Sequence, residues 1–289
     1  VVGLKPTYGL VSRSGVIAMA SSTDVIGPIA NSVEDASLVL DIIAGQDPLD
    51  GTTIKRQESY LPPTTYHLPP TKIGVIKEYF GEGLDQGVQS QIEKAIEDLK
   101  AAGAEIVEVS LPSLSLALAV YYIVCPAEVS SNLARYDGQR FGHALQSAKD
   151  LDESYEGARE QGFGEEAKRR IMIGTYVLSS GYYDAYYKKA QTVRTKLINE
   201  FNEVFKTVDF LLGPVAPTTA FKIGQNAQDP LAMYLGDIMT VGASMVGIPA
   251  VSVPCGESDG MPVGLQLMAP QRKDKELLAL ASAYEELRA

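Results

Sequence analysis

The sequence contains few of the residues from which many catalytic and structural sites are built. Its two cysteines, Cys125 and Cys255, are too few for a disulfide framework or a zinc site. Its two histidines, His67 and His143, lie in no motif of a Ser-His-Asp or Cys-His enzyme. We therefore expect solvated or capping histidines, no metal site, and the reduced interior of the cytoplasm as the location.

Long apolar runs and positive charge are also scarce. No apolar stretch reaches the roughly 18 to 20 residues that cross a bilayer, so we expect no membrane segment. The formal net charge of −11 argues against a free-standing surface for nucleic-acid phosphates, although a partner protein could still hold nucleic acid. Neither a Walker loop, nor a Gly-x-Ser-x-Gly elbow, nor a dinucleotide fingerprint occurs. From motifs of this kind alone, the sequence contains no recognisable catalytic centre.

The apolar residues that are present follow helical and strand periods in turn. Ser32, followed by Glu34 and Asp35, is a candidate N-cap for the first helix. The strand–helix–strand order over 73–109 indicates an α/β layer architecture. A proline-rich linker is expected at 61–70, with strands at 73–76, 104–109, 210–212, 250–253 and 263–267. Helices are expected at 32–44, 89–102, 114–135 with a bend at Pro126, 165–179, 184–208, 229–246 and 273–287.

The first nine residues read Val-Val-Gly-Leu-Lys-Pro-Thr-Tyr-Gly, and they are unusually apolar for a chain end. This stretch predicts an internal strand. Together with other segments in the same order, it resembles the amidase-signature family. Those segments are 21–28, 34–36, 126–138, 168–175, 178–187, 213–218, 247–249 and 253–256.

Two of these segments resemble the tRNA-dependent amidotransferase branch of that family. They read Ser-Asn-Leu-Ala-Arg-Tyr-Asp-Gly (131–138) and Ser-Ser-Gly-Tyr-Tyr-Asp-Ala-Tyr-Tyr (179–187). The resemblance implies an α/β fold in which a mixed β-sheet lies between α-helices, with the N-terminal part absent. It also implies that residues 1–289 form the C-terminal portion of a single amidase-signature domain.

In the family that the chain resembles, catalysis uses a Ser-cisSer-Lys triad, in which a neutral lysine draws a proton through a bridging serine. The resemblance places all three residues upstream of Val1, so we expect no catalytic residue in this chain and no activity from the chain alone. Lys5 follows the nucleophile loop and is not the triad lysine. It is instead expected to be a strand-end lysine near the surface.

The resemblance assigns three residues to a glutamine substrate. Arg170 suits the α-carboxylate because its planar fork can bind both oxygens, Asp237 suits the α-ammonium, and Tyr122 can close the pocket. Each assignment has an alternative nearby in the sequence. These alternatives are Arg169, Asp229 and Tyr121, and the sequence leaves them open.

The resemblance also implies partners. The glutaminase of such a complex hydrolyses glutamine and passes ammonia to the B subunit, which uses ATP and Mg²⁺, contacts the tRNA and converts Glu-tRNA(Gln) to Gln-tRNA(Gln). A small C subunit completes the complex. This chain itself is expected to bind no cofactor and to self-associate through its exposed apolar surface. The alternatives are a fragment of a general amidase and a non-catalytic interaction module.

A stripe of tyrosines is a further candidate surface. Its members are Tyr182, Tyr183, Tyr186 and Tyr187. Nearby basic residues would allow stacking on RNA, but an aromatic packing surface, within the fold or against a partner protein, is the favoured interpretation. Cys255 is expected to be a small buried residue at a strand end.

Overall fold

The computed structural model describes residues 1–289 except 57–58, 62–70, 226–229 and 289. Most of the expected linker at 61–70 and His67 lie outside the described residues. Contacts divide the chain into two compact units. We call Val1–Ser14, Val25–Leu118 and Arg194–Ala289 the sheet unit, and Gly15–Asp24 with Ala119–Val193 the helical unit. That the whole chain belongs to a single domain stays a prediction.

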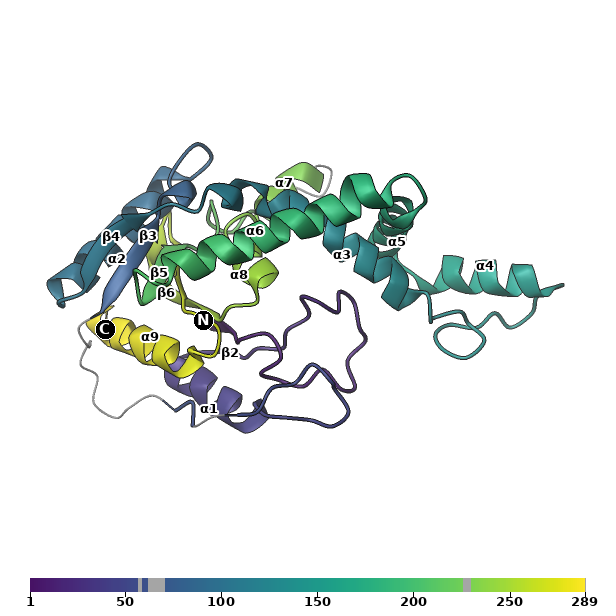
Figure 1. The fold of residues 1–289 in the computed structure, drawn as a ribbon, viewed down its shortest axis with the longest axis horizontal. Helices are drawn as coiled ribbons and strands as arrows, with labels where there is room; N and C mark the ends of the chain where they lie inside the picture. Colours follow the sequence, from purple (N-terminus) through teal and green to yellow (C-terminus); the bar gives the residue numbers. More distant parts are fainter. Residues whose placement is uncertain (57–58, 62–70, 226–229, 289) are drawn as a thin grey trace. The chain divides into compact units, whose positions relative to one another are not determined.

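The sheet unit is built on a mixed sheet with the strand order β2-β1-β6-β7-β5-β3-β4 (Figure 1). Its strands are β1 Val2–Lys5, β2 Ile29–Ala30, β3 Lys72–Ile76, β4 Glu105–Val109, β5 Phe210–Pro214, β6 Ala250–Ser258 and β7 Met261–Met268. Strand β3 is parallel to β4 and β5, whereas the other pairs are antiparallel. The predicted mixed sheet is therefore confirmed, and the N-terminal segment is indeed a strand of it.

The helices are α1 Val33–Ile43, α2 Gln86–Ala101, α3 Ala117–Leu133, α4 Leu151–Gly162, α5 Glu165–Leu178, α6 Lys189–Val204, α7 Pro230–Leu235, α8 Val241–Val246 and α9 Asp274–Arg288. Short 3₁₀ turns cover Lys77–Tyr79 and Pro112–Leu116, and a π-helical turn covers Tyr183–Lys188. Helices α1 and α9 lie side by side in Figure 1 and belong, with α2, to one hydrophobic core.

Side chains alternate across the sheet, as the pleat requires. Phe210 and Leu212 of β5 lie in the core with α1, α2 and α9, and Leu211 between them is also fully buried. On α8, a Cβ added to Gly242 would meet Leu114 at 2.6 Å and approach Phe201 of α6. Helices thus pack closely on α8 as well as on the α1, α2 and α9 side, which confirms a sheet enclosed by helices.

A local signal located the start of the first helix correctly. Ser32 caps α1, since its side-chain oxygen accepts a hydrogen bond from the Asp35 amide at 3.1 Å. Helix α2 begins three residues earlier than expected because Asp85 accepts hydrogen bonds from the amides of Gly87 and Val88. The strands expected at 250–253 and 263–267 are present but longer, and they form a hairpin joined through Asp259 and Gly260, which both have positive φ.

One expected helix was wrong, one was right only in part, and one helix was not expected. Residues 229–246 do not form one helix, because α7 and α8 are separated by a turn in which the amides of Thr240 and Val241 donate to the Asp237 carbonyl. The long helix expected from residue 184 begins with the π-helical turn. Helix α4 was not anticipated, although Asp150 caps it, because it is polar on average and Ala158 is its one buried residue.

The expectation that no stretch could cross a membrane needs a correction as well. The segment Pro112–Leu133, which includes α3, is long and apolar enough to do so, with a mean hydropathy of 1.5. In the structure, 56% of its most apolar window is buried inside the protein. A helix buried in this way is typical of the core helices of soluble proteins, so the segment is weak support for a membrane span.

Candidate functional site

Two of the three residues assigned to the substrate lie in the helical unit, where α5 carries Arg170 and α3 carries Tyr122. Nη1 of Arg170 donates to the hydroxyl of Tyr121 at 3.3 Å and lies 3.8 Å from Sγ of Cys125. The ring of Tyr121 makes an edge-to-face contact with the ring of Tyr122, with centroids 4.9 Å apart. Arg170 and Tyr122 are therefore brought together through Tyr121.

Glu166 connects the two candidate arginines. Its carboxylate accepts a hydrogen bond from Nε of Arg170 at 2.7 Å and is also ion-paired with Arg169. Burial opposes the charge on Arg170, but the Glu166 carboxylate and the neighbouring Tyr121 offset this, and the pKa of Arg170 is raised. Burial would raise the pKa of Glu166, yet its bonds to Arg170 and Arg169 lower it. All three groups are therefore charged at neutral pH.

The two arginines differ in their surroundings. The side chain of Arg170 is 18% exposed and faces α3, whereas that of Arg169 is 38% exposed. Burial beside tyrosine rings favours a guanidinium that holds a ligand, since a low dielectric strengthens its hydrogen bonds. The geometry thus favours Arg170 over Arg169 as the arginine that holds a ligand.

Asp237 belongs to the sheet unit, whereas Arg170 and Tyr122 belong to the helical unit. It is exposed and lies in the turn between α7 and α8, where its carbonyl accepts a hydrogen bond from the hydroxyl of Thr240 at 3.1 Å. Its alternative, Asp229, lies outside the described residues. The assignment of Asp237 to an ammonium group stays a prediction.

Lys5 is not the surface lysine that the sequence suggested. It ends β1, is partly buried, and donates from Nζ to the Pro6 carbonyl at 3.1 Å. Burial lowers its pKa from the usual 10.5 to about 8, against the attraction of Asp274. Asp274 is 1% exposed and accepts hydrogen bonds from the amide and the hydroxyl of Thr7. The pattern Leu-Lys-Pro contains no sign of this environment, which distant residues create.

Lys5 also lines a cavity of about 330 Å³ on one face of the sheet. Gln266 of β7 lines the same cavity, with its Nε2 donating to the Met239 carbonyl at 3.1 Å. Oε1 of Gln266 is buried and has no hydrogen-bond partner within the described residues. A cation and a hydrogen-bond acceptor therefore line a cavity that sequence reasoning did not identify.

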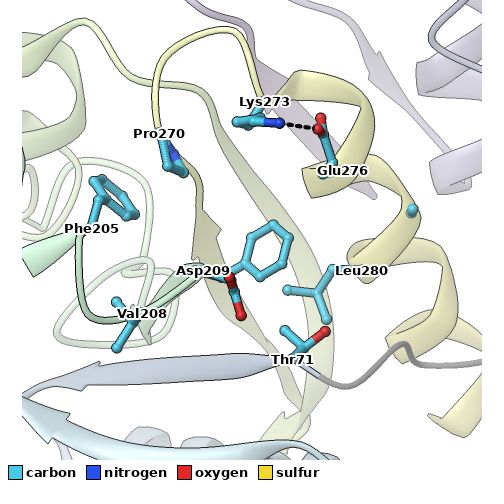
Figure 2. Close-up of a pocket in the computed structure, with 10 residues that line it drawn as sticks. Thr71, Phe205, Val208, Asp209, Pro270, Lys273, Glu276 and Leu280 are labelled. Atoms are coloured by element: carbon cyan, nitrogen blue, oxygen red, sulfur yellow. Dashed lines mark hydrogen bonds and ion pairs between the residues drawn. The ribbon is translucent and has the colours of Figure 1, made fainter.

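A second cavity of the sheet unit, of about 440 Å³, contains none of the predicted site residues. Figure 2 shows Phe205, Val208 and Leu280 along its walls. Lys273 and Glu276 at its edge form an ion pair with each other at 2.5 Å (Figure 2). Asp209 accepts a hydrogen bond from the Lys72 amide at 2.8 Å. The charged groups that line this cavity are paired with neighbouring protein groups, so the cavity does not resemble a reactive site.

The other candidates have structural surroundings. Cys255 is buried in the main core, and burial raises the pKa of its thiol to about 11, as expected for a small apolar residue. His143 lies between α3 and α4 and was not expected to be catalytic. Tyr182 and Tyr186 are exposed and pack with Tyr176, so the tyrosine stripe is a surface cluster in the described structure.

Comparison with known proteins gives consistent matches. The model of the Amidase family matches residues 1–278. The A subunit of glutamyl-tRNA(Gln) amidotransferase from Koribacter versatilis is 54% identical over 287 residues, which are 99% of this chain and 60% of that protein. The corresponding A subunit from Caldanaerobacter subterraneus subsp. tengcongensis is 51% identical over 286 residues, which are 99% of this chain and 59% of that protein.

Solved structures agree with the sequence comparison. The crystal structure of the glutamyl-tRNA(Gln) amidotransferase A subunit from Thermotoga maritima matches with a TM-score of 0.80 and 41% identity, covering 99% of this chain and 57% of that one. Peptide amidase from Stenotrophomonas maltophilia matches with a TM-score of 0.73 and 28% identity, covering 99% and 58%. The chain therefore spans about three-fifths of the length of the relatives it matches.

Proposed function

This chain belongs to the amidase family, and from that membership we propose that it is the substrate-binding part of a glutamine-hydrolysing amidotransferase subunit. The ammonia released would convert Glu-tRNA(Gln) to Gln-tRNA(Gln). The observation that carries the proposal is identity of 50% or more, over 99% of the chain, to several proteins named as the A subunit of glutamyl-tRNA(Gln) amidotransferase. Among the solved structures, the peptide amidase is less similar, at 28% identity, than the A subunit from Thermotoga maritima, at 41%.

In the proposed enzyme, Arg170 holds the α-carboxylate of glutamine, Asp237 holds the α-ammonium, and Tyr122 forms an aromatic wall. The proposal for Arg170 is supported by its partly buried, charged guanidinium and its place beside the tyrosines of α3. An amino-acid substrate carries both charges, so it needs one residue of each sign. A simple amide needs neither, and this difference separates the proposal from a general amidase.

The nucleophile, the bridging serine and the base belong, in this proposal, to a segment that precedes Val1 in the longer relatives. Lys5 has a lowered pKa, as a lysine base requires, but it follows the position of the nucleophile loop in the family order. We therefore propose that Lys5 is not the base and that the isolated chain does not hydrolyse glutamine.

The remaining parts of the proposal concern partners and location. The protein would work in the cytoplasm with the B and C subunits of the amidotransferase. The B subunit would bind ATP and Mg²⁺ and contact the tRNA, so this chain would need no cofactor of its own. The multi-subunit arrangement is supported by the names of the relatives, which designate them as one subunit of a larger enzyme.

The proposal is tested by measuring ammonia release from glutamine. The purified chain should release none, and a chain preceded by the amino-terminal two-fifths of the Koribacter relative, the share that the match leaves uncovered, should release it. Release by the chain alone contradicts the proposed position of the triad. Release from simple amides but not from glutamine, by the extended protein, identifies a general amidase. An extended protein that folds and hydrolyses no amide favours a non-catalytic interaction module.

The substrate contact is tested with two matched variants of the extended protein. Arg170→Ala should raise KM for glutamine by a factor of about 30 or more, because a charge-assisted hydrogen bond contributes roughly 2 to 3 kcal/mol. Arg169→Ala is the matched control, since it removes a neighbouring guanidinium that shares Glu166. Equal effects of both variants would remove the distinction between the two arginines.

A further inference from the structure

Tyr121 contacts both residues that the proposed function places at the substrate in the helical unit. Its hydroxyl lies 3.3 Å from Nη1 of Arg170, and its ring lies edge-to-face against Tyr122, at 81° between the ring planes. In the sequence, Tyr121 was the alternative to Tyr122. In the structure, the hydroxyl of Tyr121 reaches the guanidinium of Arg170.

The contacts of Arg170 define how its guanidinium is oriented. Nε is held by Glu166 at 2.7 Å, and Nη1 is held by Tyr121 and approached by the thiol of Cys125. Since the guanidinium is planar, anchoring two of its nitrogens fixes the plane of the third. Nη2 has no hydrogen-bond partner among the residues that the structure describes. The end of the fork is therefore held in place and left for a ligand.

The charge around the fork suits an anion. Glu166 is shared between Arg169 and Arg170, so two positive groups and one negative group leave an excess of one positive charge. Burial raises the pKa of Tyr121, so its hydroxyl is neutral at physiological pH and does not cancel that charge. A neutral hydroxyl can accept from the guanidinium while leaving the positive charge available.

We propose that Tyr121 is a positioning residue that holds Arg170 and Tyr122 in place to bind the carboxylate of an amino-acid substrate. This inference rests on the proposed function, which assigns the carboxylate to Arg170. Without the hydroxyl, Arg170 keeps its bond to Glu166 but can rotate about it. The ordering of the guanidinium is then lost before binding, which weakens the affinity for carboxylates and leaves other ligands unaffected.

The test uses Tyr121→Phe in the chain itself, because Tyr121, Tyr122 and Arg170 belong to one compact unit. The substitution keeps the ring, which packs against the buried cluster that contains Cys125, and removes the hydroxyl alone. Affinities are measured by NMR titration with L-glutamine, with its α-amide, which lacks the carboxylate, and with glutaramate, which lacks the ammonium. Thermal unfolding of each variant shows that the fold is kept.

Tyr121→Phe should weaken the binding of glutamine and of glutaramate about three- to tenfold, the usual effect of losing one hydrogen bond. Binding of the α-amide should not change, a ligand dependence that a general loss of packing would not produce. Cys125→Ala is the matched control, because it removes the more distant contact of the same nitrogen, and its effect should be less than about twofold.

Three results would overturn the inference in different ways. If Arg170→Ala weakens glutamine binding and Tyr121→Phe does not, Tyr121 does not position the arginine, and the proposed function stands. If no carboxylate binds to the unmodified chain, or Arg170→Ala has no effect, the assignment of Arg170 fails and the inference fails with it. Equal weakening of all three ligands by Tyr121→Phe indicates a role in packing only.

Discussion

Replacing Lys5 by methionine should stabilise the protein at neutral pH and remove part of its pH dependence. Methionine keeps an unbranched side chain of similar length at the end of β1 and removes the ammonium group. In the folded protein burial lowers the pKa of Lys5 from 10.5 to about 8, so the charged form is disfavoured by folding. The unfolded chain carries the same charge in water without that cost.

The magnitude follows from the difference between the two pKa values. Each pKa unit corresponds to about 1.36 kcal/mol, so the 2.5-unit difference between 10.5 and about 8 sets an upper bound of about 3 kcal/mol. Loss of the hydrogen bond from Nζ to the Pro6 carbonyl offsets about 1 kcal/mol of this. We expect Lys5→Met to raise the free energy of unfolding by about 2 kcal/mol at pH 7.

The sign of the pH dependence is equally specific. Between pH 8 and 10.5 the unfolded chain binds the proton of Lys5 and the folded chain does not, so the free energy of unfolding rises with pH in this window. The methionine variant lacks this rise. The difference between variant and unmodified chain is therefore largest below pH 8 and shrinks toward pH 10.5.

The assay is chemical unfolding at several values from pH 7 to pH 10, comparing the midpoints of the two proteins under identical conditions. Other groups that titrate in this range are common to both proteins and cancel in the difference. The exposed Lys77 supplies the control, because Lys77→Met should change the free energy of unfolding by less than about 0.5 kcal/mol. Parallel pH profiles for Lys5→Met and the unmodified chain would refute the reasoning.

Three further outcomes are expected. Thr7→Val should destabilise the protein by about 2 to 3 kcal/mol in thermal unfolding, because the buried Asp274 carboxylate loses the hydroxyl donor at 2.5 Å; an unchanged midpoint would contradict this. Gly174→Ala should cost at least about 2 kcal/mol, since its Cβ would lie 1.9 Å from the Pro126 carbonyl oxygen, whereas Gly164→Ala, where a Cβ meets nothing within 4 Å, is the control. The purified chain should self-associate in sedimentation experiments, because apolar residues such as Ile29 and Ile42 are 77% and 75% exposed; a monomer at high concentration would argue against it.

Much of the fold could be predicted because its signals are local. Ser32 precedes two acidic residues and an apolar helical stripe, and the cap forms as expected. The wrong and missing helix predictions also have local causes. Around Asp237 the sequence is apolar enough for a helix, but the chain turns there and the helix divides into α7 and α8. Helix α4 is mostly solvated, and its polar composition gives little sign of a packed helix.

Identity with the family could be recognised from short sequence segments, and the candidate substrate residues followed from them. The sequence could not decide which of two neighbouring candidates contacts the substrate. Arg169 and Arg170 are the same type of residue at adjacent positions. Only the packing of α5 beside α3 buries Arg170 next to Tyr121 and leaves Arg169 more exposed.

The sequence by itself determined the α/β architecture, the family and the residue types available to a glutamine site. Tertiary structure alone decided how those residues behave. Lys5 acquires its lowered pKa, and Tyr121 its hydrogen bond to Arg170, from groups on other elements. Thr7 and Asp274, which meet beside Lys5, are 267 positions apart along the chain. The physical reason is that burial and hydrogen bonding depend on distance in space, which a local sequence pattern does not contain.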